Sequence, residues 1–177
     1  MPNKNKAEHE CEVLAFAQHY AKQGWSVFPL HSIKDGKCAC GARDCTAQGK
    51  HPILSNGFKK ATTNEDQIQT WFGDYFKGAN IGVCTGAISG IVVIDIDSHK
   101  PEGVASLEKL EALIDSTGAR KQATGGGGEH WVFKYPAAKE IRCRTNWLPG
   151  IDVRADGGYI VAAPSLHKSG GVYEWEY

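Results

Sequence analysis

The sequence predicts an α+β fold for a chain of 177 residues. Two observations support this class. Apolar residues recur at helical spacing in separate amphipathic stretches, and several short apolar runs between glycine-rich turns have the length and composition of strands. The chain is long enough for one domain or two small lobes with a substantial core, and its sequence contains no internal repeat.

Local signals place the elements of the first half. Apolar residues at helical spacing predict a helix over 8–22, which Gly24 can end. A short apolar run predicts a strand over 25–30. Thr63 or Asn64 can cap a short amphipathic helix.

The second half is predicted to be mostly strands. Two apolar runs, 80–85 and 91–97, predict a strand pair joined by the small-residue turn 86–90. A second amphipathic helix follows, with its end near Gly118 and an apolar face of Val104, Leu107, Leu110 and Ile114. Further short strands are expected at 122–124, 131–135, 151–153, 159–163 and 172–175.

Charge is balanced, with 20 Lys and Arg against 20 Asp and Glu. A simple DNA-coating protein carries a global basic field, so this composition restricts any nucleic-acid contact to a local patch. The amino terminus is polar and leads into a charged helix, which predicts neither a signal peptide nor a membrane span. We therefore expect a cytoplasmic protein without a membrane partner.

The segment 31–56 has no periodicity and carries three thiols and an imidazole: Cys38, Cys40, Cys45 and His51. Zinc prefers four such ligands in a tetrahedron, and a loop without a hydrophobic core needs another source of stability, such as a bound metal. Cytoplasmic cysteines are reduced, which favours a metal over disulfides. The pattern predicts a zinc-binding loop with His51 as the fourth ligand, and His31 is the alternative for that position. The competing interpretation is a mobile loop with free thiols. The other cysteines, Cys11, Cys84 and Cys143, are predicted to be small core residues.

The strand predicted over 91–97 ends in two carboxylates. Successive side chains of a strand alternate between faces, so Asp95 and Asp97 are expected to share a face and point at the same object. Two acids placed this way repel each other unless a cation or a base lies between them. This favours a divalent cation site over a plain polar strand end.

A glycine run, 125–128, precedes His130, which opens an apolar strand. Such a run lets a bulky anion, such as a nucleotide phosphate, approach the main chain, although a flexible surface turn explains it equally well. Further on, Asp152 and Arg154 lie two residues apart and so on one strand face. Such a pair is most often structural. Together with the two earlier acids, Asp152 would complete a three-acid metal site.

The order of these pieces resembles the amino-terminal primase-polymerase (prim-pol) domain of the archaeo-eukaryotic primase superfamily, as in plasmid and phage replication proteins. The resemblance runs from about Gly24 to Trp175. It is carried by an ordered set of motifs: 24–30, the cysteine loop with its Gly-Lys-His-Pro end, 61–63 followed by Trp71-Phe72, 80–86, Asp95-Ile96-Asp97, the glycine-rich His130 motif, 150–154, 157–159 and Ala163-Pro164-Ser165.

The resemblance implies a two-lobed catalytic domain over 1–177, with a catalytic sheet related to the RNA-recognition-motif fold. It implies template-directed nucleotidyl transfer, as a DNA primase and DNA polymerase that uses single-stranded template, primer, and dNTPs or NTPs. Carried over by motif, Asp95, Asp97 and Asp152 hold catalytic Mg²⁺ or Mn²⁺ ions and His130 contacts the incoming triphosphate. The same comparison assigns nucleotide or template contacts to Lys50, Arg154 and Ser165.

In the family a helical region and often a helicase domain follow, so we expect a fragment of a longer replication protein from a bacterial, archaeal or virus-infected cell. Such a fragment is expected to extend primers more readily than it starts them. Two other functions remain open. One is a metal-dependent nuclease or strand-nicking replication initiator, with Tyr159 or Tyr173 as nucleophile. The other is a non-catalytic, zinc-stabilised nucleic-acid-binding module. The sequence leaves the nucleotide preference, the template start sequence and the oligomeric state undecided.

Overall fold

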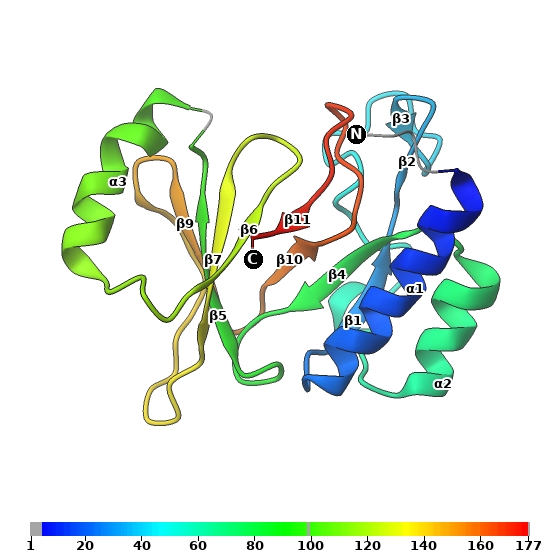
Figure 1. Ribbon diagram of the computed structural model, residues 1–177, viewed down its shortest axis with the longest axis horizontal. Helices are drawn as coiled ribbons and strands as arrows, with labels where there is room; N and C mark the ends of the chain where they lie inside the picture. Colours follow the sequence, from blue (N-terminus) through cyan, green and yellow to red (C-terminus); the bar gives the residue numbers. More distant parts are fainter. Residues whose placement is uncertain (1–4, 99, 177) are drawn as a thin grey trace.

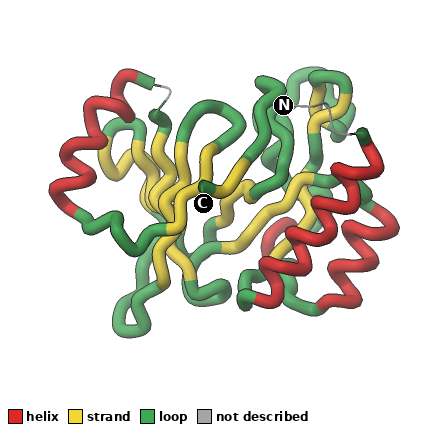
Figure 2. The backbone as a smooth tube through the Cα atoms, viewed as in Figure 1, coloured by secondary structure: helices red, strands yellow, loops and turns green. Residues whose placement is uncertain are grey.

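The structure is a computed structural model that describes residues 5–98 and 100–176. Its strands form a three-stranded sheet of order β1-β4-β10, a six-stranded sheet of order β11-β6-β7-β5-β9-β8, and a small hairpin, β2-β3 (Figures 1 and 2). The strands are β1 (Val27–Leu30), β2 (Ile33–Lys34), β3 (Lys37–Cys38), β4 (Asn80–Cys84), β5 (Ile91–Ile96), β6 (Arg120–Ala123), β7 (Glu129–Lys134), β8 (Arg144–Leu148), β9 (Ile151–Arg154), β10 (Tyr159–Ala162) and β11 (Glu174–Trp175). The helices are α1 (Lys6–Lys22), the 3₁₀-helix η1 (Gly57–Lys60), α2 (Glu65–Ile68), the π-helix η2 (Gln69–Tyr75) and α3 (Pro101–Leu113).

Helix α1 confirms the first predicted helix. Asn5 and Glu8 form a capping box, in which each side chain accepts a hydrogen bond from the other residue's backbone N–H. Val13, Ala17 and Tyr20 are fully buried because their spacing places them on one helix face. That face lies against the three-stranded sheet, with α1 and α2 side by side (Figure 1).

The six-stranded sheet separates two cores. Ile94 and Ile96 of β5 pack with Leu110 of α3, whereas Val93 belongs to the core shared with the three-stranded sheet. Asp95 lies on the same face of β5 as Val93, since side chains alternate along a strand. The alternation therefore directs this carboxylate toward the space between the two sheets.

The predicted pairing of strands 80–85 and 91–97 is wrong. The turn between them exists, because the Gly86 N–H donates to the carbonyl of Ile91 at 2.7 Å. However, β4 pairs with β1 and β10, and β5 pairs with β7 and β9. Both edges of each strand are thus occupied, and the turn connects two sheets instead of closing a hairpin.

Helix α3 keeps only part of its predicted apolar face. Leu110 is buried, but Val104 is 56 % exposed, and the helix ends at Leu113, before the predicted end. Its first turn packs through a glycine: a Cβ on Gly103 would lie 2.3 Å from the carbonyl oxygen of Asp97. The start of α3 therefore rests directly on the end of β5. Within the described part of the chain, no helix is long and apolar enough to cross a membrane.

The other predicted strands are present as β6, β7, β9, β10 and β11, each close to its predicted bounds. Strand β8 was not predicted. It is an exposed edge strand with an irregular register against β9, and Asn146 within it has a left-handed backbone, with φ of 53°. Such a strand has no apolar alternation for a sequence pattern to detect.

Candidate active site

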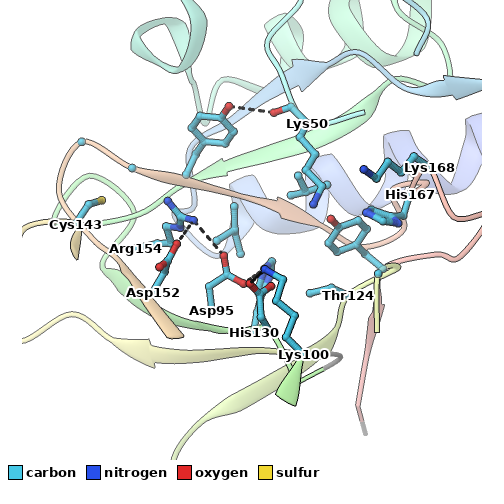
Figure 3. Close-up of a pocket in the computed structure, with 18 residues that line it drawn as sticks. Lys50, Asp95, Lys100, Thr124, His130, Cys143, Asp152, Arg154, His167 and Lys168 are labelled. Atoms are coloured by element: carbon cyan, nitrogen blue, oxygen red, sulfur yellow. Dashed lines mark hydrogen bonds and ion pairs between the residues drawn. The ribbon is translucent and has the colours of Figure 1, made fainter. Parts of the chain in front are cut away.

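Three of the expected site residues lie in one row across the six-stranded sheet. Asp95 of β5 is directly opposite His130 of β7 on one side and Asp152 of β9 on the other. Residues directly opposite each other in antiparallel strands project from the same face. The two acids and the imidazole therefore point into one space between the sheets, as Figure 3 shows.

Arg154 lies between the two acids of this row. Its Nη2 is 3.3 Å from Asp95 Oδ2 and 2.6 Å from Asp152 Oδ2. The other oxygen of Asp152 accepts a hydrogen bond from the backbone N–H of Asn146 at 2.6 Å, and Asp95 Oδ1 lies 3.5 Å from His130 Nε2. The guanidinium offsets the repulsion between carboxylates on adjacent strands.

The same neighbours keep Asp95 ionised. Burial on its own raises the pKa of this carboxyl group, but its contacts with His130 and Arg154 outweigh burial and bring the pKa to about 2. Asp95 is therefore a carboxylate throughout the neutral range, which is the form that binds a cation.

Asp97 lies one residue beyond β5. Its carboxylate pairs with Lys100, and its backbone N–H donates to the carbonyl of Gly150 at 2.9 Å. It lines the same cavity as Asp95 and Asp152. Among the described residues, however, the three acids do not form a tight group of ligand atoms comparable to the cysteine cluster below.

The cavity at this row has a volume of about 740 Å³, and residues of both main sheets line it. Its cations are Lys50, Lys100, Arg154 and Lys168 (Figure 3). Further lining side chains include Thr124, Cys143, Tyr159, His167 and Tyr173. Carboxylates and cations that line one cavity suit a ligand that carries several negative charges together with bound divalent cations.

Of the two remaining expected contact residues, Lys50 and Ser165, the structure places only the first in the cavity. Lys50 lines the cavity, and its backbone carbonyl accepts a hydrogen bond from the Tyr159 hydroxyl at 3.0 Å. Ser165 is fully buried, its hydroxyl accepts from the backbone N–H of Ile81 at 2.9 Å, and it does not line this cavity. Ser165 therefore connects β4 to the segment that follows β10.

A second cluster lies in the cysteine loop. Cys38, Cys40, Cys45 and His51 offer ligand atoms that all lie within 4.8 Å of one another, so this group can hold a metal ion. His51 Nε2 is 3.4 Å from the sulfur of Cys38 and 3.5 Å from that of Cys45. A tetrahedral zinc ion with ordinary bond lengths sets sulfur and nitrogen about 3.6 Å apart.

The thiols of this loop differ in their tendency to ionise. Burial raises the pKa of the Cys38 thiol, but hydrogen bonds from the backbone N–H groups of Cys40 and Gly49 and from the side chains of Cys40 and His51 outweigh burial and bring the pKa to about 6, which favours the ligating thiolate. Burial and the two neighbouring thiols instead raise the pKa of the Cys45 thiol to about 11. His31 is not in the cluster; its ring lies 4.5 Å from that of His51. The geometry thus selects His51 over His31 as the fourth ligand.

Packing accounts for part of the glycine run. A Cβ on Gly125 would lie 2.4 Å from the Cβ of His167, and one on Gly128 would lie 2.5 Å from the carbonyl oxygen of Ile96. Gly126 lines the cavity. The run therefore fits between β5 and the loop after β10, and it leaves main chain exposed to the cavity at one position.

Sequence reasoning missed several lining residues. Lys168 and His167 follow the Ala163-Pro164-Ser165 motif, and Lys100 follows Asp97 by three residues. Only their closeness in sequence to these motifs could have indicated that they line the cavity. Cys143 was predicted to be a core residue, as was Cys11, but both are exposed; only Cys84 of these three is buried. Cys143 lies in the irregular segment around β8, where no periodicity indicates burial.

A comparison with protein-family models finds a match to the family described as bifunctional DNA primase/polymerase, N-terminal, over residues 17–177. No curated protein matches the chain. The matched range contains the acids of the cavity, the imidazole of His130 and the cysteine cluster. Because the match covers most of the sequence, the chain belongs to the family of bifunctional DNA primase/polymerase amino-terminal domains.

Proposed function

We propose that this domain is the catalytic core of a plasmid or phage type replication protein, with both DNA primase and DNA polymerase activity. Family membership indicates nucleotidyl transfer of this general kind. The observation that carries the proposal further is the row of Asp95, His130 and Asp152 in a cavity that four cationic side chains also line. In this reaction a primer 3′-hydroxyl attacks the α-phosphorus of a nucleoside triphosphate, and pyrophosphate leaves.

The acids fit a site for Mg²⁺ or Mn²⁺. Both ions prefer oxygen ligands, and Asp95, Asp97 and Asp152 present carboxylates to one cavity. When bound, two divalent cations would lower the pKa of the attacking hydroxyl and neutralise charge on the leaving pyrophosphate.

The other residues of the cavity receive the nucleotide in this proposal. Lys50, Lys100 and Lys168 provide charge for the triphosphate, and His130 donates a hydrogen bond toward it. Without cations, Arg154 bridges the carboxylates of Asp95 and Asp152 and offsets their repulsion. None of these steps needs a covalent nucleophile.

The architecture supports the two-lobed arrangement of primases. We assign the three-stranded sheet with α1 and α2 to one lobe, and the six-stranded sheet with α3 to the RNA-recognition-motif-related lobe that carries the acids. Residues 1–177 form one catalytic domain in this proposal, and helical and helicase regions of a replication protein are its partners. Zinc in the cysteine cluster would staple the loop that carries Lys50.

The test is extension of a labelled primer on a single-stranded DNA template with Mn²⁺, using dNTPs and NTPs separately. We expect extension by the parent protein and none by the double variant Asp95→Ala, Asp97→Ala. The matched control, Glu108→Ala, Glu111→Ala, removes two exposed acids of α3 and should extend normally. Normal extension by the Asp95, Asp97 variant would exclude this site assignment.

The same reactions separate the alternatives. Template cleavage that depends on Asp95 would favour the nuclease, whereas DNA binding without nucleotide binding would favour the non-catalytic module. Dinucleotide synthesis is measured alongside, because the domain alone is expected to extend primers faster than it starts them. Equal rates for the two reactions would contradict that expectation.

A further inference from the structure

Gln122 extends the row of site residues by one strand. It lies on β6 directly opposite His130, and its side chain is fully buried. It does not line the cavity, so it cannot contact a ligand there. Its amide instead connects the three-stranded sheet to the imidazole of the site.

Two backbone groups fix which way the Gln122 amide points. The N–H of Ala163 can only donate, so its partner at 2.7 Å must be Oε1. The carbonyl of Val161 can only accept, so its partner at 3.1 Å must be Nε2. Val161 belongs to β10 and Ala163 follows it directly, so the three-stranded sheet sets the orientation of this amide.

The amide in turn determines the proton on His130. Gln122 Nε2 lies 2.8 Å from His130 Nδ1, and an amide nitrogen can only donate. His130 Nδ1 must therefore accept and carries no proton. The imidazole N–H is then at Nε2, on the side of Asp95 Oδ1, 3.5 Å away.

We propose that Gln122 is a positioning residue that keeps His130 as a hydrogen-bond donor at Nε2. A protonated Nε2 has no lone pair, so it neither ligates a metal ion nor accepts a proton as a general base. It can donate to an anionic oxygen, either of Asp95 or of a nucleotide phosphate in the cavity. The role toward the nucleotide rests on the proposed function; the tautomer itself does not.

The first test is spectroscopic and needs no activity. Imidazole ¹⁵N NMR of the parent protein should show a protonated Nε2 and a bare Nδ1 for His130, assigned by the loss of these signals in His130→Asn. In Gln122→Met the donor to Nδ1 is removed, so Nδ1 is no longer kept bare and part of the proton population should move to it. A bare Nε2 in the parent, or an unchanged tautomer in Gln122→Met, would overturn the proposal.

The second test measures consequences for the nucleotide. In Gln122→Met, the KM for dNTPs in primer extension should rise about tenfold, equivalent to about 1.4 kcal/mol, while kcat changes less. Calorimetric titration with dATP and Mn²⁺ should show the same loss of affinity. If Gln122→Met does not fold, Gln122→Leu, which also lacks the amide, serves for the tautomer and for both affinity measurements.

The control, Ser89→Ala, removes a similarly buried hydrogen bond, from the Ser26 N–H to Ser89 Oγ, in the turn between the sheets. It should lower stability without changing the His130 tautomer or the KM. Equal effects of Ser89→Ala and Gln122→Met on KM would mean that Gln122 acts only through stability and does not position His130. An inactive parent with the expected tautomer would count against the proposed function and leave the positioning role standing.

Discussion

At the scale of single residues, both acids of the row are already fully engaged by protein groups. One oxygen of Asp152 faces the Asn146 N–H and one of Asp95 faces His130, while the second oxygen of each faces Arg154. A divalent cation bound here would therefore share or replace the contacts of the guanidinium. We therefore expect Arg154 to stabilise the domain most when no cation is present.

This competition predicts a metal-dependent effect of Arg154→Gln. Without divalent cations the variant should be less stable by about 1 kcal/mol, because two facing carboxylates lose their partner. For a domain of this size the loss lowers Tm by about 2–4 °C. Saturating Mn²⁺ should close the gap, since the cation takes over the role of the guanidinium. Thermal unfolding with EDTA and with Mn²⁺ measures both values.

The control for this prediction is Arg142→Gln, which removes an exposed arginine that pairs with Glu140. It should change Tm little under either condition, because exposed ion pairs contribute little. A deficit in Arg154→Gln that stays the same in saturating Mn²⁺ would mean that the cation does not bind at these carboxylates.

The low pKa of Asp95 predicts acid sensitivity. Its folded-state pKa of about 2 lies below the ordinary value of 3.8, so its stabilisation is present above about pH 4 and is lost as pH falls toward 2. The difference corresponds to about 2 kcal/mol. Urea unfolding between pH 5 and pH 2.5 should show a shallower pH dependence for Asp95→Asn than for the parent. Parallel curves would show that Asp95 does not titrate in this way.

At the scale of elements, the sequence predicted what local patterns control. Helix α1 and strands β6, β7, β9 and β10 were predicted because their periodicity and turns lie within the segment. The assignment of β4 and β5 to different sheets was not, because it depends on partners far away in the chain. For the same reason, the sequence showed that Asp95 ends a strand but could not show that Arg154 lies against it.

The cysteine loop illustrates a site that spacing predicts well. Its ligands lie close in the chain, so a short loop brings them together without help from the rest of the fold. Lys50 is flanked by Gly49 and His51, and Gly49 O accepts from the Asn80 side chain at 2.8 Å. The loop therefore places Lys50, which lines the cavity, next to His51 of the cysteine cluster.

This arrangement predicts one zinc per chain and different effects of its two histidines. His51→Ala should lose zinc and lower Tm, whereas His31→Ala should retain zinc, because only His51 reaches the thiols. Zinc content by atomic emission and thermal unfolding measure the two effects. Cys11→Ser, at an exposed cysteine outside the loop, is the control and should keep full zinc. Zinc retained in His51→Ala but lost in His31→Ala would reverse the assignment.

At the scale of the whole molecule, a cluster of aromatic residues joins the two sheets. The Tyr20 hydroxyl of α1 donates to the carbonyl of Ala163 at 2.8 Å and accepts from the indole N–H of Trp175 on β11 at 2.7 Å. Trp25 stacks on Tyr20, and Arg120 of β6 lies over the rings of Trp25 and Trp175. No sequence pattern predicts this contact, because its members come from distant parts of the chain.

Ala163 connects this cluster to the site, because its carbonyl accepts from Tyr20 and its N–H donates to Gln122. The variant Tyr20→Phe leaves a buried carbonyl and an indole N–H without their partner. We expect the free energy of unfolding to fall by about 1–3 kcal/mol.

Because the same peptide segment orients Gln122, we also expect weaker dATP binding in Tyr20→Phe, although Tyr20 is not a cavity residue. Urea unfolding and calorimetry measure the two effects. Tyr75→Phe, at a tyrosine that is 76 % exposed, should change neither quantity. If Tyr20→Phe lost stability but bound dATP as the parent does, the docking of the sheets and the geometry of the site would be independent. A joint loss would show that contact between the sheets maintains the geometry of the row from Gln122 to Asp152.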